Sequence, residues 1–320
     1  MISIDVRNVN DGYNRLTRLV AQLGKLSDSR NGKVLSIECP VMVKMRSPCE
    51  RVLFDAARRA NPFFHLFEAM WMLAGSDQVG PVRFYNSQMY TYSDDGERFN
   101  AAYGHRWRKH FGYDQIERAI EMLRANPKDR RVVISMWDPR DDLGSDSLDI
   151  PCNQQIMPRV YEGKLNFLTT NRSNDLIWGL MGANAVHLTI LMEYMALRLG
   201  LPVGEWVHVS NNLHVYEHHF ELIRAVQPDP SLCWIQWPGV QPLLKNEEDY
   251  KDFDQDCLDL VAGSVDDFRT EFFDLTVAPL VQAYHKHKAG DHEGAKYDAS
   301  CIEANDWRRA SLLWLKGAKK

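Results

Sequence analysis

Apolar residues recur at helical spacing in some stretches of the chain and alternate with polar residues in others. Residues 11–25 carry apolar side chains on one helical face, at Leu16, Leu19, Val20 and Leu23. The polar run 27–32 breaks this pattern and predicts a turn that carries Arg30. The alternating run 34–39 then predicts a strand.

Further along, Pro62 opens an apolar helical segment over residues 63–73, which Gly75 ends. Apolar and β-branched runs predict strands at 131–137, 164–170 and 206–210, and a long apolar helix over 185–199 that ends at Gly200. The chain has no internal repeat, low-complexity tract or Pro/Gly/Ser linker. We therefore expect one mixed α/β domain over residues 1–320.

Composition narrows the class of protein. The chain of 320 residues is 45% hydrophobic and 25% charged, which is typical of a globular protein. A formal charge of −5 without a Lys/Arg block argues against direct binding of nucleic acid. Six scattered cysteines without a CxxC pair indicate reduced thiols. With no run of eighteen apolar residues and no leader, we expect a cytoplasmic protein without a membrane segment.

Candidate chemistry centres on a cysteine and an arginine. Cys152 lies in residues 150–154 (Ile-Pro-Cys-Asn-Gln), and Arg172 follows twenty residues later in Asn-Arg-Ser-Asn-Asp, residues 171–175. A thiol needs nearby positive charge to attack at neutral pH, and a guanidinium suits phosphate. This pairing favours attack on a phosphorylated substrate. The alternative is a buried structural cysteine beside a surface arginine that pairs with Asp175.

Glu68 is the polar exception in the apolar segment 63–73. A buried, desolvated carboxyl has a raised pKa that suits proton transfer, whereas a carboxylate on the solvated side of the helix has no such role. Both interpretations stay open on this pattern alone.

Histidines cluster between positions 208 and 219. His214 and His218 have the i, i+4 spacing of a metal pair, but no third ligand accompanies them at helical spacing. On a strand, His214 and Tyr216 would instead share a face and bind a sugar hydroxyl. Arg130 and Arg131 precede a predicted strand, where adjacent side chains point to opposite faces, so at most one serves a given pocket. Glycine-rich nucleotide loops are absent from the sequence.

Taken together, these segments resemble the thymidylate synthase superfamily, folate-dependent enzymes that transfer a one-carbon unit to C5 of a pyrimidine nucleotide. The resemblance runs in order over roughly residues 15–220. It rests on seven motifs: a phosphate loop at 28–32, a glutamate helix at 68–75, YGxxWR at 103–108, the pair Arg130-Arg131, Pro151-Cys152, RSxD at 172–175 and HxY at 214–216.

The resemblance implies an α/β (α+β) fold with a large mixed β-sheet packed with helices, and a symmetric dimer through the sheet face. It implies catalytic roles for Cys152, Glu68, Tyr103 and Asn184. Substrate-binding roles fall on Arg30, Arg130, Arg131, Arg172, Ser173, His214 and Tyr216. Arg130 and Arg131 would come from the partner in an obligate homodimer, and Asp175 would hold the folate. The implied co-substrate is 5,10-methylenetetrahydrofolate, with no metal.

Departures from the synthase pattern bear on the reaction. Asn184 keeps its spacing to His214 and, by resemblance, reads uracil, since aspartate at this position accompanies cytosine. Residues 85–95 lack the synthase tryptophans, Asn153 stands where histidine is common, and the chain end lacks the short apolar tail that closes the synthase site. A wetter site favours hydroxymethylation over reductive methylation.

We therefore expect a phage-type nucleotide hydroxymethylase that prefers dUMP, with dCMP close behind, serves DNA modification and works in a host cytoplasm. Reductive methylation of dUMP or dCMP is the main alternative. Two further alternatives are a non-catalytic nucleotide-binding member of the family and a cysteine hydrolase that uses Cys152 with His208 or His214 as base.

Overall fold

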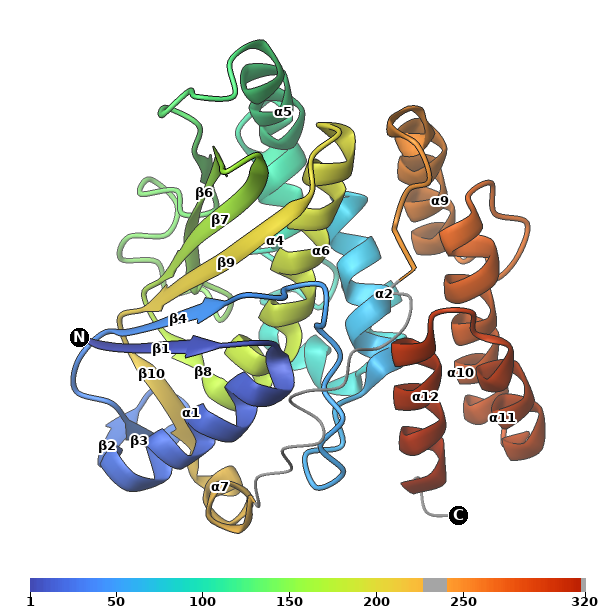
Figure 1. Cartoon of the computed structure of the whole chain (residues 1–320). Coiled ribbons are helices and arrows are strands. Elements are labelled where there is room, and N and C mark those ends of the chain that lie inside the picture. Colours follow the sequence, from blue (N-terminus) through green and yellow to red (C-terminus); the bar gives the residue numbers. More distant parts are fainter. Residues whose placement is uncertain (227–240, 318–320) are drawn as a thin grey trace.

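The computed structural model describes residues 1–226 and 241–317, which form two sheets and surrounding helices (Figure 1). The larger sheet has six strands in the order β1-β4-β9-β7-β6-β5. Their bounds are β1 Ile2–Val6, β4 Val41–Met45, β5 Ile134–Ser135, β6 Asn153–Tyr161, β7 Lys164–Asn171 and β9 Val203–Ser210. The smaller sheet, in the order β2-β3-β10-β8, consists of β2 Lys25–Ser29, β3 Gly32–Ser36, β8 Asn174–Asp175 and β10 Leu213–Tyr216.

The larger sheet is mixed, as expected from the sequence. β7 and β9 pair in parallel, as do β1 and β4, and the other neighbours are antiparallel. Along β9, buried and half-buried residues alternate, with Trp206, His208 and Ser210 on the inner side. This alternation is typical of a sheet covered on one face.

Helices cover the inner face. α6 (Asn184–Arg198) lies along β7 and β9, and α2 (Pro62–Leu73) packs on α6 (Figure 1). Every residue of α2 is buried, because further helices cover its outer side. Phe63 meets the ring of Trp314 edge-on at 5.4 Å and that of Tyr284 at 5.3 Å. The helix that carries Glu68 is therefore enclosed between two layers.

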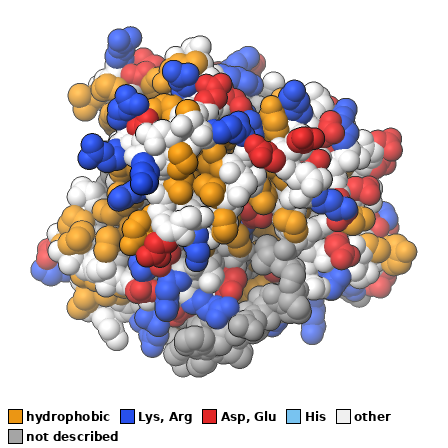
Figure 2. Space-filling view, turned by 45° about the horizontal axis from the view of Figure 1, so that its top comes forward, with side chains coloured by type: hydrophobic (Ala, Val, Ile, Leu, Met, Phe, Trp, Pro, Cys, Tyr) orange, Lys and Arg blue, Asp and Glu red, His pale blue; other side chains and the backbone are white. Residues whose placement is uncertain are grey.

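The opposite face of the larger sheet carries no helix among residues 1–226 and 241–317, and it faces the viewer in Figure 1. Adjacent strands place half-buried apolar side chains side by side there, namely Met42, Val209, Val207, Leu168 and Met157. We call this set the open sheet face. In a view turned by 45° from that of Figure 1, hydrophobic side chains lie among lysines and arginines on the surface (Figure 2).

The remaining helices complete the fold. Those that precede β9 in the sequence are α1 Val9–Leu23, α3 Val79–Tyr85, η1 Ser87–Tyr92, α4 Tyr103–His105, η2 Arg106–His110, α5 Gln115–Ala125 and η3 Leu176–Ala183. Those that follow β10 are η4 Glu217–His219, α7 Phe220–Ala225, η5 Glu247–Asp249, α9 Tyr250–Ala262, η6 Phe273–Val277, α10 Ala278–Lys288, α11 His292–Cys301 and α12 Asn305–Gly317. The stretch Leu176–Arg198 is long and apolar enough to span a membrane, but 83% of its apolar window is buried, as in the core helix of a soluble protein.

The structure confirms the predicted helices at 11–25, 63–73 and 185–199 and the predicted strands at 164–170 and 206–210, with shifts of a few residues at their ends. Gly75, with φ of 63°, ends α2 as expected.

Three expectations need correction. Residues 27–29 belong to strand β2 rather than to a turn, which leaves only Arg30 and Asn31 between β2 and β3. The strand predicted at 34–39 begins at Gly32 and ends at Ser36. Only Ile134 and Ser135 of the strand predicted at 131–137 pair in register with β6, because the backbone N–H groups of Met136 and Trp137 both donate to the Gln154 carbonyl instead of continuing the ladder. Just before it, Arg131 donates its backbone N–H to Asp129 Oδ1 instead of to a strand.

Candidate active site

A cleft of about 670 Å³ opens where the two sheets meet. The β2–β3 hairpin, the loop 142–150, and the ends of β7, β8 and β10 contribute its walls. Seven of the residues expected to form the site line this cleft, namely Arg30, Cys152, Arg172, Ser173, Asp175, His214 and Tyr216. The fold thus brings together segments that lie almost two hundred residues apart in the sequence.

Cys152 and Arg172 are neighbours because β6 and β7 pair in an antiparallel hairpin. Cys152 directly precedes β6 and Arg172 directly follows β7, and the Arg172 N–H donates to the Cys152 carbonyl at 3.0 Å. The guanidinium donates from Nε to the Pro151 carbonyl at 2.8 Å and from Nη2 to the Ile150 carbonyl at 3.0 Å. Main-chain carbonyls, rather than Asp175, therefore orient Arg172.

The Cys152 thiol experiences opposing influences. Burial raises its pKa most, the positive charges of Arg172 and Arg30 lower it, and the Asp149 carboxylate raises it. The net pKa lies above the ordinary thiol value. As expected, the charges of the two arginines lower the thiol pKa and favour the thiolate. In a single chain, however, the effect of burial on the pKa is larger than theirs.

Arg30 stands at the turn between β2 and β3 and reaches the loop on the other side of the cleft. Its Nη1 donates to the Ser147 carbonyl at 3.2 Å and its Nη2 to the Leu148 carbonyl at 3.0 Å. The side chain is exposed, so its charge faces the solvent-filled mouth of the cleft. An anion at this mouth meets two guanidinium groups, those of Arg30 and Arg172.

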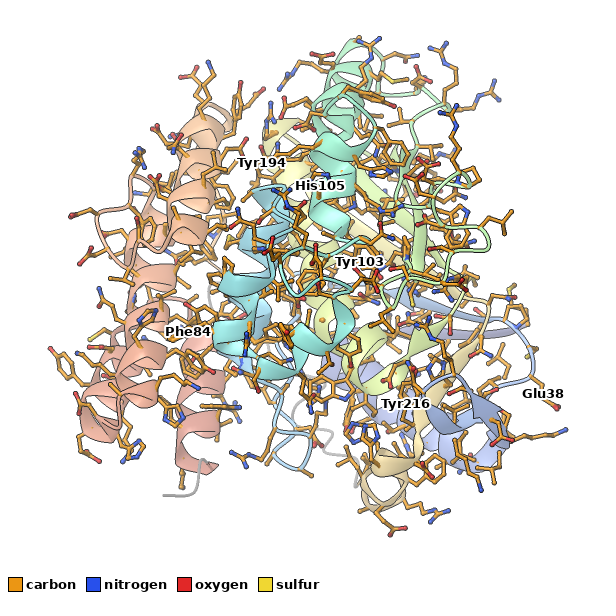
Figure 3. The ribbon with its side chains drawn as sticks, turned by 180° about the vertical axis from the view of Figure 1, so that it is seen from behind. Glu38, Phe84, Tyr103, His105, Tyr194 and Tyr216 are labelled. Carbon is orange, nitrogen blue, oxygen red and sulfur yellow. The ribbon has the colours of Figure 1, made fainter. Side chains whose placement is uncertain are left out.

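Tyr103 begins α4 and lies deep beside the nucleophile. Its hydroxyl accepts the backbone N–H of Asn153 at 3.4 Å, and burial raises its pKa. Gly104 packs against the backbone of α2, where a Cβ atom would lie 2.0 Å from the Met72 carbonyl oxygen. Tyr103 from α4 and Tyr216 from β10 thus reach the site from different layers (Figure 3).

Glu68 is 5% exposed, so the interpretation that it occupies a solvated side is wrong. Its Oε2 lies 2.9 Å from Nε2 of His187, which is 3% exposed and stands on the facing helix α6. His65 lies one turn earlier on α2, and burial lowers its pKa well below the ordinary value. Glu68 and His187 therefore form a close buried pair between α2 and α6, although neither contacting atom makes a well-directed hydrogen bond among the described residues and Glu68 does not line the cleft.

Asn184 begins α6 and belongs to a cluster of amides beneath the cleft. Its Nδ2 donates to Asn174 Oδ1 at 3.2 Å, and its Oδ1 accepts from Asn153 Nδ2 at 3.5 Å. A Cβ atom at Gly179 would lie 2.4 Å from Asn174 Oδ1, so only glycine allows this approach. The cluster fixes which way the Asn184 amide faces.

Asp175 caps the helix η3 and keeps one oxygen free. Its Oδ1 accepts the backbone N–H groups of Ile177 at 2.5 Å and Trp178 at 2.8 Å. Its Oδ2 is buried and has no hydrogen-bond partner among the described residues. Burial raises the pKa of Asp175 to about 6. A buried acceptor without a donor fits the nitrogens of a folate pterin, which are hydrogen-bond donors.

His214 and Tyr216 lie on β10, as the ribose interpretation expects, with ring centroids 5.0 Å apart. His214 Nδ1 lies 2.9 Å from Asn212 Oδ1. His218 belongs to η4, so His214 and His218 do not share a helix and the i, i+4 metal interpretation fails. A different group, His110 with Asp138 and Asp141, has ligand atoms close enough to hold a metal ion, but none of the three lines the cleft.

Arg130 and Arg131 lie outside the cleft of their own chain. The side chain of Arg131 is 82% exposed and donates from Nη2 to Asp129 Oδ2 at 2.7 Å. Sequence reasoning missed Asn174, His187 and Asp149, whose roles depend on contacts between distant segments that leave no local pattern.

Comparison with known proteins agrees with this geometry. The family model described as thymidylate synthase matches residues 11–236. The chain is 38% identical over 98% of its length to the deoxyuridylate hydroxymethyltransferase of Pseudomonas phage M6, of which it covers 93%. It is 36% identical over 64% of its length to the enzyme of the same name from Bacillus phage SP01, of which it covers 56%. A putative thymidylate synthase of Methanothermobacter marburgensis is 39% identical over 42% of this chain and 59% of its own.

Proposed function

Because the chain belongs to the thymidylate synthase family, we propose that it hydroxymethylates C5 of dUMP with 5,10-methylenetetrahydrofolate as co-substrate. The observation that carries the proposal is that Cys152 lines one cleft together with Arg172 and Arg30, whose positive charges act on its thiol. The relatives named deoxyuridylate hydroxymethyltransferase support uracil as the base and, since they are phage proteins, DNA modification in a host cytoplasm.

The thiolate of Cys152 adds to C6 of the pyrimidine, and the electron pair of the C5–C6 double bond moves to C5, which becomes nucleophilic. Arg30, Arg172 and Ser173 bind the phosphate. The phosphate dianion, bound by two guanidinium groups, fixes the nucleotide so that C6 lies next to the Cys152 sulfur. The attack then takes place within one complex and needs no further encounter between the reactants. His214 and Tyr216 bind the ribose 3′-hydroxyl.

Protons are handled on the inner side of the cleft. Tyr103 helps to remove the C5 proton after the new bond forms, and Glu68 exchanges protons with the base through water. Asn184 reads the base. Asp175 holds the pterin through its free Oδ2. C5 bonds to the one-carbon unit of methylenetetrahydrofolate, and loss of the C5 proton then expels tetrahydrofolate. Water adds to the exocyclic carbon as the bond between Cys152 and C6 breaks, which releases the product and restores the thiolate.

Support for water rather than hydride as the final nucleophile comes from the cleft walls. None of the described residues after Tyr216 lines the cleft. The last described helix, α12, packs its Trp314 on Phe63 at the outer side of α2. Helix α12 therefore packs away from the cleft and leaves its walls to residues before 217 among those that the structure describes. Reductive methylation remains the second candidate, which the putative thymidylate synthase relative favours.

We also propose that two chains pair through the open sheet face, so that each lends Arg130 and Arg131 to the phosphate site of the other. The apolar stripe of this face and the exposure of Arg131 support pairing. Residues 1–320 act as one catalytic domain, since α9, α10 and α12 pack on the helix that carries Glu68.

The pairing proposal has a direct test. An inactive Cys152→Ala chain and an inactive Arg130→Ala/Arg131→Ala chain are mixed under conditions that exchange subunits. Mixed dimers contain one site with an intact cysteine and intact arginines, so activity returns. Two variants that stay inactive after proven exchange would show that the arginines act within their own chain.

The reaction itself is tested with purified protein, methylenetetrahydrofolate and either dUMP or dCMP. Product mass and dihydrofolate absorbance are followed together. A hydroxymethyl product without dihydrofolate supports the proposal, whereas a methyl product with equal dihydrofolate establishes reductive methylation. Turnover that persists in Cys152→Ala would contradict both, and absence of turnover with nucleotide binding intact would indicate a non-catalytic member of the family.

A further inference from the structure

A series of buried polar side chains leads from Asn184 into the larger sheet. Asn184 Nδ2 donates to Asn174 Oδ1, and Asn174 Nδ2 lies 2.9 Å from Nε2 of His208. Nδ1 of His208 lies 2.6 Å from Thr169 Oγ1, which accepts the Trp206 indole N–H at 3.0 Å. His208, Thr169 and Trp206 have no exposed surface, and none of the three lines the cleft. We call these five residues the amide relay.

The imidazole in the middle of the relay is neutral. Burial lowers the pKa of His208 to about 3, so the ring carries one N–H at neutral pH. A neutral imidazole donates from one nitrogen and accepts at the other. With Asn174 Nδ2 directed at Nε2, the proton resides on Nδ1 and is shared with Thr169 Oγ1.

The ring tautomer decides the direction of both amides. With Nε2 as acceptor, Asn174 presents its oxygen to Asn184, whose Nδ2 therefore faces Asn174 and whose Oδ1 faces Asn153. Movement of the ring proton to Nε2 would require Asn174 to turn over, and Asn184 would have to turn over in response. The positions of the donor and the acceptor that Asn184 offers would then be exchanged.

Uracil and cytosine also differ by an exchange of a hydrogen-bond donor and an acceptor. Uracil presents a donor at N3 and an acceptor at C4, whereas cytosine presents an acceptor at N3 and a donor at C4. An isolated asparagine is able to serve either base by turning its amide over, so by itself it discriminates weakly. A fixed amide direction makes one base leave buried polar groups unpaired.

We propose that His208 and Thr169 are positioning residues that fix the Asn184 amide and thereby make the site prefer uracil over cytosine. The inference rests on the proposed function, in which Asn184 reads the base. Neither residue touches the nucleotide. Their effect reaches it through Asn174, so this preference is set beneath the cleft and not by its lining alone.

The test compares Thr169→Val with Thr169→Ser. Valine keeps the shape of threonine and removes the oxygen that binds His208 Nδ1, whereas serine keeps that oxygen and is the matched control. For each protein, kcat/KM is measured with dUMP and with dCMP. We expect the dUMP-to-dCMP ratio to fall by about tenfold or more in Thr169→Val and to stay near the wild-type value in Thr169→Ser.

The controls separate the possible failures. Thr169→Val replaces the hydroxyl with a methyl group, whereas Thr169→Ser removes the methyl group, so thermal melting checks separately that each variant folds. If Thr169→Val folds but does not turn over, the ratio is taken from the Kd values of dUMP and dCMP. A ratio that is equal in both variants, or a wild-type protein that treats both bases alike, contradicts the relay. A wild-type protein that transfers no one-carbon unit to either nucleotide contradicts the proposed function instead.

Discussion

The carboxylate of Glu68 and the imidazole of His187 lie 2.9 Å apart on the facing helices α2 and α6, and both side chains are more than nine-tenths buried. His187 stands one turn after Asn184 on α6, so in the proposed reaction it would lie between Glu68, which exchanges protons, and Asn184, which reads the base. A buried carboxylate that loses its partner either rotates or takes up a proton.

We expect His187→Ala to lower kcat by about ten- to hundredfold and to change the KM for dUMP little, because the arginines bind the phosphate. Steady-state kinetics measure both constants. In a Glu68→Gln background the same substitution should have almost no further effect on kcat. Equal losses in both backgrounds would mean that His187 acts only through stability.

Asp149→Asn should make Cys152 more reactive. After burial, the pKa of the thiol is raised by the negative charge of Asp149, while Arg172 opposes it. An asparagine oxygen still accepts the Ala101 N–H, which Asp149 Oδ2 accepts at 2.7 Å. Removal of the charge should lower the thiol pKa by about half a unit, so alkylation by iodoacetamide should be roughly threefold faster below that pKa. Mass spectrometry assigns the alkylated cysteine, and an unchanged rate-versus-pH curve would refute the electrostatic argument.

Asp175→Asn should stabilise the fold at alkaline pH and impair the reaction. The folded-state pKa of about 6 is above the unfolded value of about 3.9, so the folded state binds more protons between these values and stability declines as the pH rises through that range. Asparagine does not titrate and still caps η3. We expect a gain of about 1–2 kcal/mol in the free energy of unfolding at pH 8 and almost none at pH 4. Denaturant unfolding of wild type and variant at pH 8 and at pH 4 measures both differences in the free energy of unfolding. An equal difference at the two pH values would contradict the prediction.

Gly104→Ala should destabilise the protein. The added Cβ would lie 2.0 Å from the Met72 carbonyl oxygen and 2.4 Å from its Cα, so α4 has to move away from α2. We expect a loss of about 3 kcal/mol or more in the free energy of unfolding, together with reduced turnover, since Tyr103 moves with the helix. Gly80→Ala is the matched control, because a Cβ at Gly80 meets nothing within 4 Å. Equal melting temperatures in the two variants would contradict the close approach.

Seven of the expected site residues line the cleft, and most of them lie in short local motifs at the ends of strands or helices. Cys152, Arg172 and Asp175 border β6, β7 and η3, and a local motif places each of them. The contact between Asn174 and His208 was not predictable, because the two residues stand 34 positions apart and meet only after β7 and β9 pair. The burial of Glu68 was equally undecidable, because α2 is apolar on all sides and the burial depends on the later helices.

Strand boundaries were less predictable for a physical reason. β6 contains Gln154, Gln155 and Pro158, a composition unlike that of a buried strand, and it gains its place by pairing with β7 on one side and briefly with β5 on the other. Pro158 is tolerated because β5 pairs with β6 only at Ile156 and Gln155. Tertiary pairing, rather than local preference, therefore determines this strand.

The strand order also has a consequence for how the chain is made on the ribosome. β4 ends at Met45, yet its partner on one side, β9, begins at Val203, so the first two strands wait for more than 150 further residues before the sheet joins them. Until then, each of β1 and β4 has only the other as a partner in the larger sheet. A nascent chain that stops before residue 210 thus holds a cysteine and its neighbouring arginine but lacks the sheet that assembles the cleft. A working enzyme first exists only after β9 and β10 have been made and both sheets are complete.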